Sequence, residues 1–109
     1  MCDIAVSNLQ ITSETDPDSP VVETCPRSVM NAFVQYVEDH TWIKVHVNNK
    51  YMTKTYGQIE SYYPLCPVLC VETNKKLFTD RSTGIIFPDK IAALRTVFQA
   101  ALLSSVSLL

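Results

Sequence analysis

The spacing of apolar residues changes twice along this chain, and these changes limit the folds open to it. From residue 28 to residue 40 the apolar positions recur about every 3.6 residues, from 42 to 47 they alternate, and from 88 onward the helical spacing returns. Each such segment has one apolar face, and these faces must pack against one another. Hydrophobic residues make up 47% of the 109 residues, which suits a packed core. The sequence therefore predicts one α+β domain.

The predicted domain covers residues 28–109. Its first helix is expected at 28–40, with Ser28 as the N-cap because a serine oxygen can accept from free backbone N–H groups. Pro88 and Asp89 favour the start of a last helix. Between them, asparagine, proline and glycine turn signals separate strands expected at 42–47, 51–56, 68–73, 76–80 and 85–87. This order predicts an N-terminal helix, a four- to five-stranded mainly antiparallel sheet and a C-terminal helix packed on the sheet.

Residues 1–27 are predicted to form a flexible acidic leader. They hold five acidic residues and one basic residue, while the remaining chain holds six acidic and eight basic residues. The stretch at 12–20 is rich in turn-forming residues and poor in large apolar ones, so it has little with which to offset the entropy of ordering. Ile4, Val6, Leu9 and Ile11 alternate with other residues, and they are an alternative edge strand for this domain or for a neighbour.

Features of export and membrane insertion are missing from the sequence. The first residues contain no basic start followed by an apolar stretch, and the apolar segment from Val97 to Leu109 is shorter than a membrane span. We therefore expect an intracellular protein, cytoplasmic or nuclear, with Cys2, Cys25, Cys66 and Cys70 reduced. The small size would also suit a viral accessory protein.

The sequence indicates no enzyme, cofactor or metal centre. It has two glycines, Gly57 and Gly84, which are far apart, and it lacks a phosphate loop, a dinucleotide fingerprint and a nucleophile elbow. Cys66 and Cys70 have the spacing of one half of a zinc site, but a second pair of ligands is missing. A cysteine nucleophile assisted by His40 or His46 stays open as an alternative, as does metal binding by the two thiols.

Protein association is the function that the sequence favours. Apolar residues continue past the stripe that one sheet would cover, and amphipathic aromatic residues are common interface anchors. The candidate contact residues are Phe98, Leu103, Val106, Leu108, Trp42, Tyr51 and Tyr56. They predict a non-catalytic interaction module, a homodimer or a small accessory subunit of a complex, that uses a sheet face or edge and the C-terminal helix. The alternative for the C-terminal residues is that they fold back over the sheet edge.

The first predicted hairpin also suggests a second function. Its face opposite the core would carry aromatic rings beside cations, a combination on which unpaired bases stack. The residues concerned are Trp42, Lys44, His46, Lys54 and Tyr56. Single-stranded nucleic acid is therefore the alternative partner, although the charge excess of the domain is small for phosphate binding.

The segment from Lys76 to Phe98 leads from a strand through Gly84 and Pro88 into a helix. In this order of elements it resembles the closing strand and helix of polo-box domains and of the Alu-binding subunits of the signal recognition particle. The likeness covers about a fifth of the chain and rests on pattern, so it implies no functional residue and no family is assigned from it.

Overall fold

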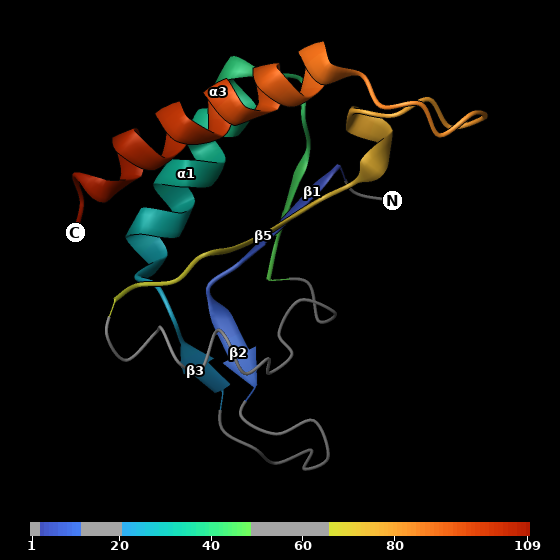
Figure 1. Cartoon of the computed structure of the whole chain (residues 1–109). Coiled ribbons are helices and arrows are strands. Elements are labelled where there is room, and N and C mark those ends of the chain that lie inside the picture. Colours follow the sequence, from blue (N-terminus) through green and yellow to red (C-terminus); the bar gives the residue numbers. More distant parts are fainter. Residues whose placement is uncertain (1–2, 12–20, 49–65) are drawn as a thin grey trace.

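The computed structural model describes residues 3–11, 21–48 and 66–109. Two helices lie beside a small sheet in Figure 1, with a separate strand pair at the far end of the first strand. The elements in chain order are β1 (Ile4–Ser7), β2 (Leu9–Ile11), β3 (Val21–Glu23), α1 (Arg27–His40), β4 (Val45–Val47), β5 (Cys70–Thr73), the 3-10 turn η2 (Lys75–Leu77) and α3 (Pro88–Val106). The described residues therefore form an α+β fold.

The main sheet has three strands in the order β4-β1-β5. The central strand β1 runs parallel to β4, with Ile4 opposite Val45, and antiparallel to β5, with Ile4 opposite Thr73. Strands β2 and β3 form a second, antiparallel pair that continues from the end of β1. The sheet therefore joins three segments that are far apart in the sequence.

The structure differs from the expected leader at residues 3–11 and 21–27. Ile4 and Val6 are fully buried and belong to the main core, and β1 is the central strand, which the alternating pattern suggested only as an edge. The physical reason is that β1 pairs with β4 and β5, whose contribution cannot be read from the local composition. Residues 12–20, where the turn-forming residues concentrate, lie outside the described residues.

Helix α1 has the predicted amphipathic face, but it is not the N-terminal element because three strands precede it. Its N-cap is Pro26, which makes no side-chain cap hydrogen bond, so the predicted Ser28 cap is wrong. The spacing predicted a face with Val29, Ala32, Phe33, Tyr36, Val37 and His40. Val29, Phe33 and Val37 are buried as predicted, but the face is rotated toward Met30 and Val34, which are buried too, and His40 is exposed.

The prediction of a four- to five-stranded mainly antiparallel sheet is not confirmed, because the described sheet has three strands and mixed pairing. At 76–80 the predicted strand is replaced by η2, since the side-chain oxygen of Asn74 accepts a hydrogen bond from Lys76 N at 3.0 Å and tightens the turn. At 85–87 the described residues form a single bridge, between Thr79 and Ile86. The predicted strand at 51–56 lies outside the described residues.

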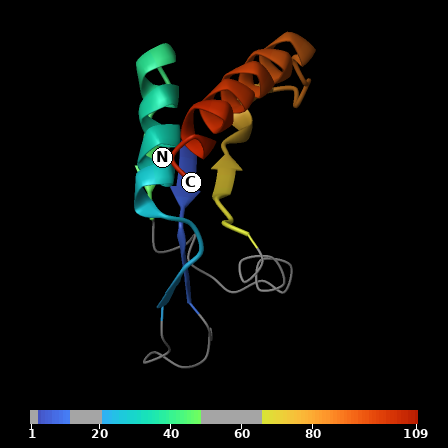
Figure 2. The ribbon, with the colours of Figure 1, turned by 90° about the vertical axis from the view of Figure 1, so that its left-hand side faces the viewer.

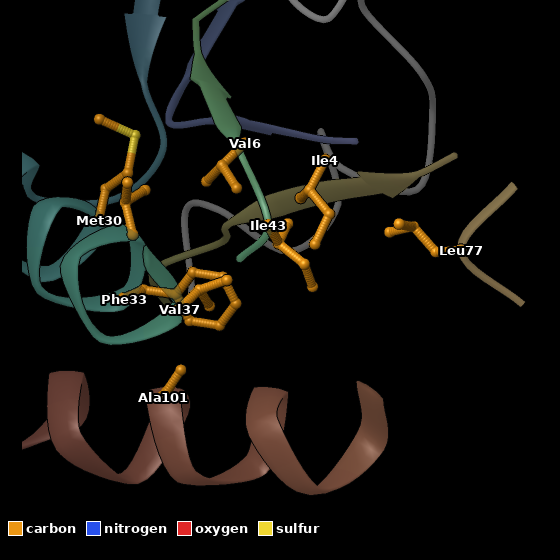
Figure 3. Close-up of a cluster of buried hydrophobic side chains, with 9 residues drawn as sticks. Ile4, Val6, Met30, Phe33, Val37, Ile43, Leu77 and Ala101 are labelled. Carbon is orange, nitrogen blue, oxygen red and sulfur yellow. The ribbon is translucent and has the colours of Figure 1, made fainter. Parts of the chain in front are cut away.

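Helix α3 begins at Pro88 as predicted and crosses α1 (Figures 1 and 2). Where they cross, Ala101 of α3 is fully buried and the rings of Phe33 and Phe98 lie 6.0 Å apart. Figure 3 shows the resulting core, in which the α1 side chains lie between those of β1 and Ala101. The C-terminal helix is therefore confirmed, but its main packing partner is α1 rather than the sheet.

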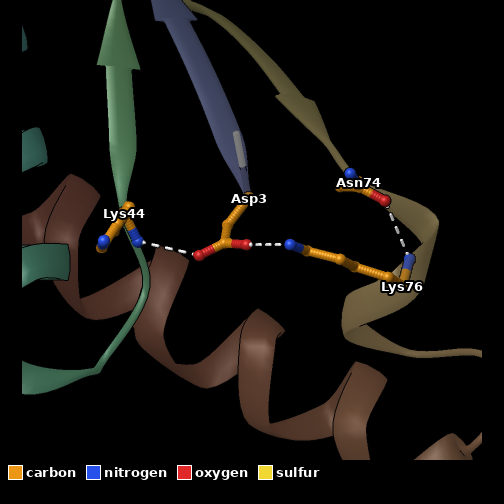
Figure 4. Close-up of polar contacts among 4 residues, drawn as sticks. All are labelled: Asp3, Lys44, Asn74 and Lys76. Atoms are coloured by element: carbon orange, nitrogen blue, oxygen red, sulfur yellow. Dashed lines mark hydrogen bonds and ion pairs between the residues drawn. The ribbon is translucent and has the colours of Figure 1, made fainter. Parts of the chain in front are cut away.

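The side chain of Asp3 connects β1 to two other segments (Figure 4). One carboxylate oxygen lies 2.8 Å from Lys76 Nζ, and the other accepts a hydrogen bond from Lys44 N at 3.1 Å. The side chain of Asp3 is 10% exposed and that of Lys76 is 33% exposed, so water reaches the pair from the lysine side and screens it in part. The hydrogen bond from Lys76 and then that from Lys44 hold the pKa of Asp3 below its ordinary value.

We expect Asp3→Asn to lower the free energy of unfolding at pH 7 by about 1–3 kcal/mol, because it removes charge-assisted hydrogen bonds in a nearly buried site. A lowered pKa in the folded state means that the contribution is complete above the unfolded pKa of about 3.9 and is lost as the pH falls through the folded pKa. Urea unfolding of both proteins at several pH values checks this. A difference between them that does not shrink below about pH 4 would contradict the assignment.

A buried amide network closes the other end of β1. Asn8 is buried, and its side-chain nitrogen donates to the carbonyl of Cys25 at 2.9 Å. Its side-chain oxygen accepts from Asn48 Nδ2 at 2.9 Å. Asn48 has a φ of 52°, a left-handed conformation that asparagine tolerates better than most residues. The network therefore fixes the bend between β1 and β2 against the end of β4 and the start of α1.

Candidate interaction surface

The C-terminal half of α3 has two apolar faces. Ala101 and Ser105 are buried, whereas Leu102, Leu103 and Val106 are exposed, with Leu103 at 73%. The helix continues to Val106, so the alternative in which this segment folds back over the sheet edge is wrong. Leu108 and Leu109 follow and are also exposed. This row of side chains is called the α3 leucine face: Leu102, Leu103, Val106 and Leu108.

An open apolar groove continues from the α3 leucine face toward the N-terminal half of the helix. It has a volume of about 370 Å³, and Phe98 and Leu94 are half-buried in it. The residues that line it are Thr73, Phe78, Ile91, Leu94, Arg95, Phe98, Gln99 and Leu102. Phe98, a predicted contact residue, therefore lines this groove and also touches the core. We name it the Phe98 groove.

A second groove is lined by another set of α3 residues, and Trp42 forms part of its lining. It has a volume of about 270 Å³. Its lining consists of Thr41, Trp42, Ile43, Lys76, Leu77, Lys90, Ala93, Leu94 and Val97. Trp42 is 77% exposed, although indole rings are usually well buried. We name it the Trp42 groove.

The residues predicted for the nucleic-acid alternative are only partly described. Lys44 and His46 are exposed beside Trp42 in the sequence, and Lys44 also joins Asp3 through its backbone. Lys54 and Tyr56, and also the contact candidate Tyr51, lie outside the described residues. The structure thus describes three of the five residues of the aromatic and cationic set that the sequence suggested, namely Trp42, Lys44 and His46.

The cysteines do not gather into a site among the described residues. Cys25 is buried, Cys70 is half-buried and Cys66 is exposed. Burial, with a smaller contribution from Glu23, raises the pKa of Cys25, and burial, with a smaller contribution from Glu72, raises that of Cys70. Within ranges 3–11, 21–48 and 66–109, no group of three or more metal-ligating side chains is present.

Sequence reasoning missed the exposed pair Ile85 and Ile86. The predicted strand there would have buried one of them, but both are more than half exposed. The loop before them is held by Asp80, whose carboxylate accepts from the hydroxyl of Ser82 at 2.7 Å and from Ser82 N at 2.9 Å. These bonds, the hydroxyl first, lower the pKa of Asp80. The sequence feature that could have indicated this loop is the pair Asp80 and Gly84, four residues apart, because both residue types favour turns.

Among the helices of the described residues, none combines the length and the apolarity that crossing a membrane requires. Comparison with family models, with curated proteins and with solved structures finds no match for this chain.

Proposed function

We propose that this protein is a non-catalytic protein-interaction module that forms a homodimer, or joins a larger complex as a small subunit, through the α3 leucine face. The observation that carries the proposal is the second apolar face of α3. A surface helix in a globular protein needs one apolar stripe, and Ala101 already lies against the core, with Ser105 buried one turn later. Leu102, Leu103 and Val106 stand outside that contact.

The neighbouring surface supports the same proposal. The Phe98 groove adjoins Leu102, so apolar lining and apolar protrusions lie next to each other on one helix. Contiguous apolar surface of this kind marks protein contact sites more often than isolated apolar residues do. Thr73, at the end of the edge strand β5, also lines the groove, so a partner in the groove would reach the sheet edge.

The test is the combined substitution Leu103→Asp and Val106→Asp. We expect the wild-type chain to sediment as a dimer, and the variant to associate at least a hundredfold more weakly, about 2.7 kcal/mol, because two carboxylates would face an apolar contact. Ser104→Asp is the matched control, since Ser104 is exposed on the same turn but is not part of the α3 leucine face.

Sedimentation equilibrium over a range of protein concentrations measures this. A wild-type chain that stays monomeric at every concentration contradicts the homodimer form of the proposal. A complex with another protein whose affinity is unchanged by the double substitution contradicts the use of α3 in either form.

Single-stranded nucleic acid is the second candidate, and the exposure of Trp42, Lys44 and His46 supports it. It is the weaker candidate because the lining around Trp42 is mainly apolar, and Lys76 there is already paired with Asp3. Binding of a labelled oligonucleotide that weakens steeply with salt would favour it over the protein partner.

A further inference from the structure

The Trp42 groove is distinct from the α3 leucine face. Its floor consists of Ile43 and Leu77, which are buried in the core, and of the half-buried Leu94 and Val97. Leu94 is the one residue that it shares with the Phe98 groove. Whatever occupies it would therefore contact the protein at a place that the proposed dimer does not use.

The charged residues that line this groove are cationic. Lys76 and Lys90 line it together with the exposed ring of Trp42, and no acidic residue among those that the structure describes does. Lys76 is paired with Asp3, whereas Lys90 makes no ion pair within the part of the chain that the structure describes. Its Nζ lies 4.8 Å from the ring centroid of Phe87, a contact that leaves its positive charge uncompensated. An apolar floor below a cation suits an occupant that is apolar on one side and negative on the other.

We infer that the Trp42 groove binds an acidic amphipathic peptide segment of a partner protein. Its apolar side chain would lie on Leu94 and Val97, and its carboxylate would face Lys90. The helix-in-groove mode of recognition has this arrangement of apolar anchors and polar rim. This inference goes beyond the proposed function, because it names a second site and the chemistry of its occupant.

Two other occupants fit less well. A second copy of α3 carries Lys90 and Arg95 against Asp89, so its net charge is positive like that of the groove, and like charges oppose binding. A small apolar anion such as a fatty acid is usually enclosed in a pocket of about 300–1,000 Å³. The Trp42 groove is open and holds about 270 Å³, which is room for side chains of a segment lying across it.

The single tryptophan of the chain makes the groove directly measurable. The probe is a synthetic helical peptide with leucines at positions i, i+3, i+4 and i+7 and glutamates elsewhere. The control peptide has lysine at every glutamate position. We expect the acidic peptide to shift the emission of Trp42 to shorter wavelength in a saturable way, and to bind at least tenfold more tightly than the lysine peptide.

Two pairs of variants test whether the peptide binds in the Trp42 groove. Ala93 is exposed and lines the groove, so Ala93→Glu should weaken binding of the acidic peptide at least tenfold, whereas Ala92→Glu on the neighbouring exposed position should not. Lys90→Glu should weaken the acidic peptide about tenfold and improve the lysine peptide, whereas Lys75→Glu, outside the groove, should change neither. All four positions are exposed, so folding is expected to survive.

The outcomes separate this inference from the proposed dimer. Leu103→Asp with Val106→Asp should leave peptide binding unchanged, while Ala93→Glu should leave the sedimentation of the dimer unchanged. Equal affinity for both peptides, no saturable emission change up to millimolar peptide, or full binding by Ala93→Glu would each overturn the inference. Saturable binding of dodecanoate without binding of the acidic peptide would overturn it in favour of a small amphiphile.

Discussion

Replacing Ile4 by alanine is expected to lower the free energy of unfolding by about 2–5 kcal/mol, a large part of the stability of a domain of this size. Ile4 is fully buried on the central strand, where it is opposite Val45 on one side and Thr73 on the other. Its truncation leaves a cavity next to the α1 side chains, and the paired strands on both sides restrict relaxation into that cavity.

The matched control is Ile85→Ala, which removes the same atoms from an isoleucine that is 60% exposed. We expect it to change stability by less than about 0.5 kcal/mol. Urea unfolding followed by circular dichroism measures both. If Ile4→Ala were as mild as its control, the segment would be the dispensable leader that its composition suggests, and β1 would not be part of the core.

The second large effect is expected for Ala101→Asp, which we predict to cost more than about 3 kcal/mol. Ala101 is fully buried where α3 crosses α1, and the Phe33 and Phe98 rings are 6.0 Å apart in the same core cluster. Aspartate at this position adds volume where none is free, and it buries a carboxylate among apolar groups with no cation facing it in the described cluster.

Ala92→Asp is the control, because it places the same residue at an exposed position of the same helix. It should remain within about 0.5 kcal/mol of the wild type. Thermal unfolding of both variants measures these changes in stability. An Ala101→Asp protein that keeps wild-type stability would mean that α3 is not docked on α1, and the assignment of its outer face would then fail as well.

The elements that sequence reasoning predicted well are those with local signals. Helix α3 begins at Pro88 because proline suits the first turn. The stripe predicted from its spacing, Ile91, Leu94, Phe98, Ala101 and Leu102, holds in part: Ala101 is buried, whereas Ile91 and Leu102 are exposed. The face of α1 was equally readable, although its start was not, because Pro26 rather than Ser28 occupies the cap. Such signals act within one turn and need no knowledge of the rest of the chain.

The elements that were missed depend on distant residues. Nothing near Ile4 and Val6 indicates that the strands on both sides of them come from residues 45–47 and 70–73. The turn after Asn74 was readable as a turn, but its 3-10 form depends on a side-chain bond to Lys76 that competes with strand pairing.

The candidate surface also has one part that the sequence could indicate and one part that it could not. The sequence left two alternatives open for Leu103 and Val106, exposure or folding back over the sheet edge, and both side chains are exposed. The Trp42 groove was not predictable, because Trp42, Leu77 and Lys90 come from three separate segments that meet only after folding. Of the other described residues of the sheet face that the sequence proposed, Lys44 and His46 line neither groove.

The position of β1 also has a consequence for how quickly the native state can form. Its partners are β4 and β5, so the three-stranded sheet cannot begin to form until residues 45–47 have been synthesised, and it is complete only after residue 73. Contacts between such distant residues slow folding, because the intervening loop loses entropy on closing before the contacts contribute a favourable free energy. A newly made chain would therefore hold Ile4 and Val6 unprotected until residues 45–47 and 70–73 have been made, and this interval is when aggregation would compete with folding.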